Sequence, residues 1–352
     1  MIVTAQSYIV MEKVPPEIWT KIWTHACLDN GYTGRSLSLV SRFVRDTSEP
    51  VRLQSISLRG HDQIFAFASL LKRMPPYLRH VRYLFITSQE ASISREPRLA
   101  KHRRSHLVRW PTTTKRFDVD TLYMNLARAV QRILTDVAET VEILEILLFH
   151  RIISSLSTSS PISFPHLREF TTNDVLLLDR PAVFNPCHQL RRLHVSQCFI
   201  SDLFGRIGTI APSLTHLRFS GVQQETCFGR DLEVALGIRA KPSQQPWELK
   251  PPARLPSSVQ KVLVKPAPPP PSGGWCGTPS ISYGSLMMEL HCLNEREDRF
   301  VLLKVEDGSS SSRRDDCEWL DRVAGGEGCW NIDDKVPRAG FVPKELGIGA
   351  FM

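Results

Sequence analysis

A short pattern of apolar residues recurs along this chain and limits the folds that are open to it. Each copy has one apolar residue, a second three positions later and a third two positions after that. Because the second and third residues are two apart, they point to the same face of a strand. The six copies are Val81/Leu84/Ile86, Val141/Leu144/Ile146, the weaker Leu167/Phe170/Thr172, Leu190/Leu193/Val195, Leu214/Leu217/Phe219 and Val259/Val262/Val264.

The spacing of these copies indicates a repeat architecture. The copies that start at Val141, Leu167, Leu190 and Leu214 follow one another after 26, 23 and 24 residues, and leucine-rich repeats have a period of about 20–29 residues. One unit cannot bury its apolar face alone, so neighbouring units must stack. We therefore predict an α/β fold in which residues 51–265 form an irregular leucine-rich-repeat solenoid, with a parallel sheet on the concave side and helices outside. The alternative is an α/β domain without repeats that contains several short buried strands.

Other segments predict the elements around these strands. Helical periodicity at residues 62–74, 120–138 and 231–238 supplies an outer layer, and alternation at 51–58 predicts a strand before the first repeat. The Pro/Gly-rich stretch 266–278 predicts an extended linker. Residues 279–338 carry helix, strand and helix patterns and are expected to form a degenerate repeat or cap, and we expect a frayed tail at 339–352.

Residues 12–50 contain two blocks of helical character. The first block reads VPPEIxxxI from Val14 and lies in an amphipathic pattern at 15–27, and the second reads LSLVSRF from Leu37. The two blocks resemble the F-box. Together with the repeats that follow, and with the phrases GYTGRSLSLVSR, LQSISLRG and GGEGCW, the chain is similar to fungal F-box-like proteins.

This resemblance implies a role in protein binding. An F-box binds a Skp-type adaptor of a cullin–RING ubiquitin ligase, and the repeats present a target protein. The chemistry then belongs to partner enzymes, so we expect a binding protein that is not an enzyme. The alternative is that the F-box-like residues only cap the solenoid, because terminal repeats need a cap. By resemblance, the adaptor contacts fall on Val14, Pro15, Pro16, Ile18, Ile22, Leu39 and Val40.

Residues between the apolar strand positions are expected to line the concave face of the solenoid. Four of them, Arg192, His194, His216 and Arg218, lie in adjacent units and predict a basic patch that favours an acidic target. A solvated strand face without a partner is the alternative. The full set of expected target contacts is Tyr83, Phe85, Glu145, Glu169, Arg192, His194, His216, Arg218 and Lys261.

The net charge of +8 is concentrated in one segment. Residues 95–116 hold eight Lys and Arg residues and one Glu, so the remainder of the chain is nearly neutral. We interpret residues 95–117 as a basic loop insertion. The open alternatives are a solvated loop, a nuclear-import signal around Lys101, and nucleic-acid binding in which Trp110 and Phe117 stack on bases.

Several other kinds of protein are disfavoured by the sequence. The chain has eight cysteines but no C-x-x-C pair, so we expect reduced thiols that are mostly small core residues. Cys187, His188, His194 and Cys198 match no zinc-finger spacing, so we expect neither a metal nor a cofactor. No apolar run approaches the roughly 20 residues of a membrane span. We therefore expect a soluble protein of the cytoplasm, the nucleus or both.

Three hypotheses about function follow. The first is an F-box-type substrate receptor with a Skp-type adaptor, a cullin ligase core and an unknown protein target as partners. The second is a repeat-based interaction scaffold that recruits no ligase. The third is a nucleic-acid-associated protein that acts through residues 95–116.

Overall fold

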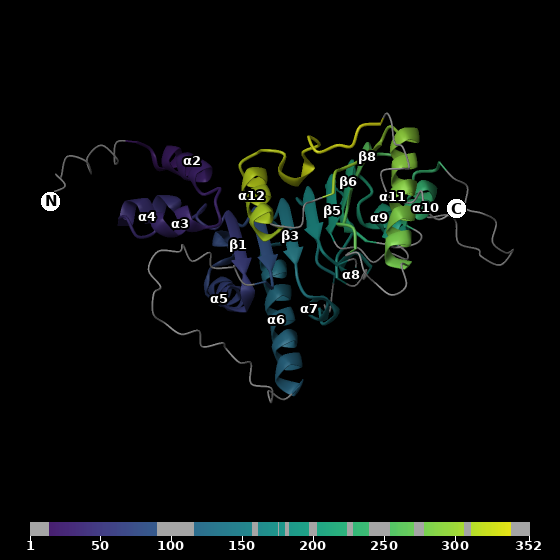
Figure 1. The fold of residues 1–352 in the computed structure, drawn as a ribbon. Helices are drawn as coiled ribbons and strands as arrows, with labels where there is room; N and C mark the ends of the chain where they lie inside the picture. The colour runs from purple at the N-terminus through teal and green to yellow at the C-terminus, as the bar shows by residue number, and fades with distance from the viewer. Residues whose placement is uncertain are drawn as a thin grey trace, which may run out of the picture.

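Within the residues that the structure describes, the chain forms one sheet of eight parallel strands that follow each other in chain order (Figure 1). The computed structural model describes residues 14–89, 116–156, 161–174, 176–179, 183–196, 203–223, 228–238, 254–270, 278–305 and 311–338. The predicted parallel sheet is confirmed, and the six copies of the apolar pattern supply β2 to β7. The strands are β1 (Ser55–Arg59), β2 (Tyr83–Thr87), β3 (Ile143–Leu147), β4 (Glu169–Thr172), β5 (Arg192–Ser196), β6 (His216–Val222), β7 (Lys261–Pro266) and β8 (Phe300–Leu302).

A helical layer covers one face of this sheet. All eighteen residues of the apolar pattern, Thr172 included, are buried, and the seventeen apolar ones belong to one core cluster with residues of the helices. Each fully buried Leu, Ile, Val or Phe side chain contributes about 1.5–3 kcal/mol. The helices are α5 (Gly60–Arg73), α6 (Arg116–Val137), α7 (His150–Ser154), α8 (Leu176–Asp179), α9 (Leu203–Ile210), α10 (Phe228–Ala235) and α11 (Thr278–Arg296). Helices α7, α8 and α9 were not predicted; α7 and α8 are too short, at five and four residues, to show a clear helical period.

Three further helices stand beyond β1 at the N-terminal end of the sheet (Figure 1). They are α2 (Pro16–Ala26), α3 (Tyr32–Leu37) and α4 (Arg42–Ser48). The prediction that a strand begins at residue 51 is wrong, because residues 51–54 form a turn closed by a 3.0 Å bond from Gln54 N to Val51 O. The buried Gln54 amide donates to Thr24 O at 2.5 Å and so fixes α2 to this turn. A Cβ at Gly34 would overlap the carbonyl oxygen of Arg52, so α3 needs a glycine there.

The C-terminal residues extend the sheet, cover its outer edge and cross one of its faces. Helix α11 and strand β8 add one further helix and one further parallel strand to the sheet. Residues 334–336 then pair antiparallel with the outer edge near β8, where Lys304 N donates to Asp334 O at 2.8 Å. This pairing covers an edge that would otherwise be open to another chain. Between these parts lie α12 (Ser311–Val323) and the 3-10 turn η2 (Gly328–Trp330), which cross the sheet face opposite the helical layer (Figure 1).

Some predictions fall on residues outside the described ranges. These residues include most of the basic segment 95–117, residues 271–277 of the expected linker, the expected tail 339–352 and residues 12–13 of the F-box-like region. In the part of the chain that the structure describes, no helix is long and apolar enough to cross a membrane.

Candidate functional site

The N-terminal helical cluster, α2 to α4, is held together by aromatic side chains. Trp19 and Trp23 stack with ring centroids 5.3 Å apart, and Trp19 meets the edge of Phe43 at 6.4 Å. Trp23 Nε1 donates to Thr47 Oγ1 at 3.1 Å. Ser41 caps α4 by accepting a bond from Val44 N at 3.2 Å. The two tryptophans and Thr20, which donates to Thr47 O at 3.1 Å, therefore hold α2 against α4.

The residues that the F-box resemblance assigns to adaptor binding are accessible on this cluster. None of the seven is buried, and α2 has no buried residue at all. Ile18 and Ile22 are each 44% exposed, and Leu39 and Val40 are 78% and 65% exposed. Side chains that only capped the sheet would be buried against it. Gly31 instead lies against Ser55 and Ile56 at the start of β1, and Gly34 and the Gln54 side chain join the helices to the turn at 51–54.

A second surface consists of the sheet face opposite the helical layer. Strand register places the predicted concave residues in two rows that run across the strands. The first row is Ser55, Tyr83, Ile143, Glu169, Arg192, His216 and Lys261. The second row is Ser57, Phe85, Glu145, Thr171, His194, Arg218, Leu263 and Val301. All nine predicted target contacts lie in these rows, while their contact with a target stays a prediction.

The chain's own residues 311–330, here named the crossing segment, lie over these rows. Trp319 packs on Phe85 with centroids 5.6 Å apart, and Val323 joins the same small cluster beside Tyr83 and Ile143. Trp319, Val323 and Phe85 are all nearly inaccessible to solvent. Sequence reasoning did not predict this cover, so the concave face is less open than we expected.

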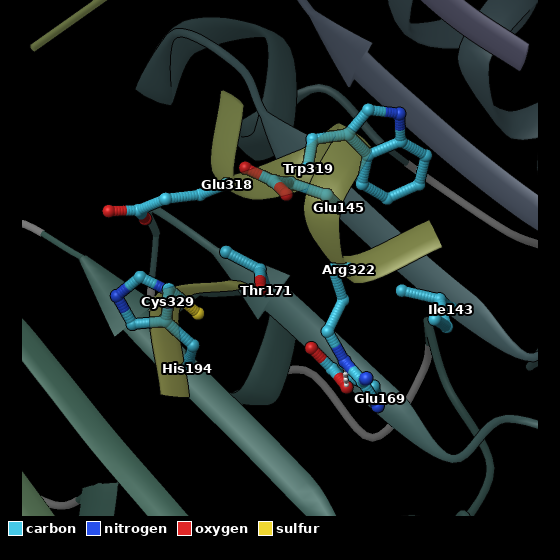
Figure 2. Close-up of a pocket in the computed structure, with 9 residues that line it drawn as sticks. All are labelled: Ile143, Glu145, Glu169, Thr171, His194, Glu318, Trp319, Arg322 and Cys329. Atoms are coloured by element: carbon cyan, nitrogen blue, oxygen red, sulfur yellow. Dashed lines mark hydrogen bonds and ion pairs between the residues drawn. The ribbon is translucent and has the colours of Figure 1, made fainter. Parts of the chain in front are cut away.

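Glu169 is the centre of the polar contacts beneath the crossing segment (Figure 2). Its side chain is only 4% exposed. Arg322 Nε donates to one carboxylate oxygen at 2.6 Å, and Trp330 Nε1 donates to the other at 2.7 Å. Arg192 approaches the carboxylate at 3.9 Å. A buried carboxylate is tolerated when it is paired and hydrogen-bonded in this way.

The predicted basic patch is brought together but is largely engaged by the crossing segment. Arg218 donates to the backbone oxygen of Cys329, and Arg192 reaches Glu327 at 3.3 Å. Burial, reinforced by Arg218 and Lys265, lowers the pKa of His194 well below its usual value. Burial, with Arg192 and Lys261, also lowers the pKa of His216. Both histidines are therefore neutral near pH 7, and they face Trp330 edge-on at 6.4 and 6.2 Å.

A cysteine–histidine pair lies in the same place but is poorly suited to nucleophilic chemistry. Cys329 Sγ is 3.8 Å from His194 Nδ1. Burial raises the pKa of the Cys329 thiol far above neutrality, so the thiol stays protonated. Because the thiolate is the nucleophile, this pair lacks the activation that a catalytic cysteine needs.

Unfilled space remains where the crossing segment lies on the sheet. A cavity of about 40 Å³ remains among Glu145, Thr171, His194, Glu318 and neighbouring residues (Figure 2). A larger space of about 390 Å³ lies further along, between Arg218 and Lys265 of the sheet and Asp333 and Asp334 of the C-terminal residues. Within the described residues, Trp319 Nε1 is buried without a hydrogen-bond acceptor. The interface is thus polar and incompletely packed.

The cysteines and the zinc candidate can be placed in part. Cys27 and Cys187 are buried, and burial raises the thiol pKa of each to about 11, as expected of small core residues. His188 is exposed, and Cys198 lies outside the described residues. The described ranges contain no group of three or more His, Cys, Asp or Glu side chains that could hold a metal ion.

The two surfaces have no counterpart from which a role could be transferred. Comparison of the chain with protein-family models, with curated proteins and with solved structures gave no match in any of the three.

Proposed function

We propose that this chain is an F-box-type substrate receptor of a cullin–RING ubiquitin ligase. In this proposal α2 to α4 bind a Skp-type adaptor, and the eight strands with their helices form an irregular leucine-rich-repeat solenoid that presents a target protein. The observation that carries the proposal is the accessibility of the seven apolar residues at the positions of the F-box pattern.

The energetics of α2 favour a partner on its open side. An isolated helix of 11 residues is marginal in water, and α2 is held on its own chain by Trp19 and Trp23 and by the bonds of Thr20 and Thr24 on the same side. Ile18 and Ile22 are four residues apart, so they lie on one face of the helix. Covering each isoleucine fully would contribute up to about 1–2 kcal/mol, since each is already partly buried. The remaining exposed apolar residues of the cluster, Leu39 and Val40, enlarge the surface that a partner could cover.

The order of the strands supports the solenoid part of the proposal. Each strand pairs in parallel with the next one along the chain, from β1 to β8, without a reversal of order. A doubly wound α/β sheet reverses its strand order and places helices on both faces. In this chain the helical layer packs on one face, and each unit contacts its neighbours, as stacked repeats do.

Co-purification with a Skp-type adaptor tests the proposal. We expect the wild-type chain to form a stable complex, and we expect Ile18→Asp with Ile22→Asp to abolish it, because two carboxylates would be buried in an apolar interface. A matched control is Ile281→Asp with Met288→Asp, which makes the same change at exposed positions of α11 on the far side of the molecule. The control variant should retain full binding.

The results separate this proposal from the scaffold hypothesis. A wild-type chain that is folded by circular dichroism yet binds no Skp-type adaptor would refute the ligase role and leave a repeat-based interaction scaffold. Equal loss of binding in the test and control variants would also count against it, because the contact would then not lie on α2.

A further inference from the structure

The two faces of the sheet are packed in different ways. The face toward the helical layer is a continuous apolar core, in which the central strand residues are fully buried. The face toward the crossing segment buries only small apolar clusters, around Trp319 and around Trp330, among charged and imidazole side chains. Cavities and an unpaired indole N–H remain between the two surfaces. Small apolar clusters among charged and hydrogen-bonded side chains are typical of an interface between separate partners, whereas a domain core is mostly apolar.

The crossing segment contacts the sheet as a helical ligand contacts a groove. Trp319, Arg322 and Val323 follow the spacing i, i+3, i+4, so they lie on one face of α12. The indole and Val323 fill the apolar spot at Phe85, and the guanidinium reaches the buried Glu169. The outward side of the helix carries Leu320, which is 36% exposed. Recognition therefore depends on three side chains of defined chemistry.

We propose that the concave face between β2 and β6 is a binding site for a helical segment with an aromatic residue, a cation three positions later and an aliphatic residue at the fourth. The crossing segment is the intramolecular occupant of this site, and a target protein binds by displacing it. That this partner is a target of the ligase rests on the proposed function, whereas the existence of the binding site does not depend on it.

The proposal revises the expected chemistry of the target. A basic patch would select an acidic partner, but His194 and His216 are neutral, Arg192 approaches the Glu169 carboxylate at 3.9 Å, and Arg218 donates to the backbone oxygen of Cys329. The deepest charge on this face is Glu169, and it pairs with Arg322. A basic and aromatic helix therefore complements the centre of the face better than an acidic segment does.

Because the crossing segment is part of the same chain, a free peptide must bind the site more tightly to displace it. A tethered segment acts at an effective concentration of about millimolar order. The apparent affinity for a second copy of the segment is reduced by the fraction of molecules in which the site is closed. Weakening the crossing segment in the intact chain should therefore strengthen the binding of a free peptide.

Fluorescence anisotropy with a labelled peptide of residues 311–332 tests this on the full chain. We expect Trp319→Ala with Arg322→Glu, made in the chain, to bind the wild-type peptide at least tenfold more tightly than the wild-type chain does. The matched control Leu320→Ala changes the outward side of α12 and should bind like the wild type. We call this double variant the opened chain. A peptide carrying Arg322→Glu should bind the opened chain at least tenfold more weakly than the wild-type peptide does. Adding Glu169→Arg to the opened chain should restore the binding of that peptide.

Three results would overturn the proposal. One is equal peptide affinity of the wild-type and opened chains. Another is an opened chain that has lost its cooperative thermal transition, since the crossing segment would then be an integral part of the fold. The third is failure of the Glu169→Arg exchange to favour the Arg322→Glu peptide. The assay contains no adaptor, so these results are independent of the Ile18 and Ile22 experiment.

Discussion

Replacing Glu169 by glutamine should loosen the crossing segment while leaving the sheet intact. Glutamine keeps the size and one acceptor oxygen of the side chain but removes its charge. Two donors now share the carboxylate, Arg322 Nε at 2.6 Å and Trp330 Nε1 at 2.7 Å. After the change, the Arg322 guanidinium stays partly desolvated beside a neutral amide.

The size of the effect follows from the burial of the partners. Breaking a fully buried ion pair costs about 3–5 kcal/mol. The Arg322 side chain is 23% exposed and also donates to Gly326 O at 2.7 Å, so part of that cost is relieved. We expect a loss of about 2–3 kcal/mol, in the range of charged hydrogen bonds. At about 1.4 kcal/mol per factor of ten, local opening should become about 30- to 150-fold more frequent.

Amide hydrogen exchange measures this opening residue by residue. We expect faster exchange at residues 317–330 and unchanged exchange at the buried strand positions of β3 and β5. Glu142→Gln is a matched control, because Glu142 pairs with Arg82 at 2.8 Å in the neighbouring unit but does not contact the crossing segment. Uniform acceleration through the whole sheet, or none at residues 317–330, would refute the view that Glu169 holds the crossing segment.

Two further predictions concern stability. Leu193→Ala should lower the free energy of unfolding by about 2–5 kcal/mol in urea titrations, because Leu193 is fully buried. Leu320→Ala on the exposed side of α12 should change the free energy of unfolding by less than about 1 kcal/mol. Similar losses in both variants would contradict the assigned core. Between pH 7.5 and 5.5 His194 takes up a proton in the unfolded chain but not in the folded chain, because its pKa is lowered in the fold. The contribution of His194 to the free energy of unfolding is therefore retained above about pH 6.5 and lost below it. His194→Gln should reduce this loss by about 1 kcal/mol, and a pH profile identical to that of the wild type would show that His194 is not held neutral.

The sequence was sufficient to predict the strands because a buried strand leaves a local signature. Leu84 and Ile86 are two residues apart on one face, and an apolar pair of the same kind recurs down to Val262 and Val264, except that Thr172 takes the second place in β4. The rows of concave residues followed from the same alternation, since their register is fixed by the apolar positions. The start of β1 was mispredicted because Val51 and Leu53 continue the alternation into a turn.

The crossing segment could not be predicted by the same means. Its key contact joins Arg322 to Glu169, 153 residues apart in the sequence, and no period relates the two. One weak signal was present, because Trp319 and Val323 form a short apolar stripe on a helix that is otherwise rich in charge. This stripe indicates that α12 packs against something, but the sequence does not reveal which surface it meets.

The chemistry of the two sheet faces explains why only one of them can exchange its cover. If the helical layer moved away, Leu193 and its neighbours would meet water at about 1.5–3 kcal/mol for each side chain. If the crossing segment moved away, Glu169, Arg192 and Arg218 would regain hydration, which offsets much of the lost pairing. Only the small clusters around Trp319 and Trp330 would be lost outright. A partner that supplied an aromatic ring for Phe85 and a cation for Glu169 would replace those contacts, so the closed and the bound states can be close in free energy.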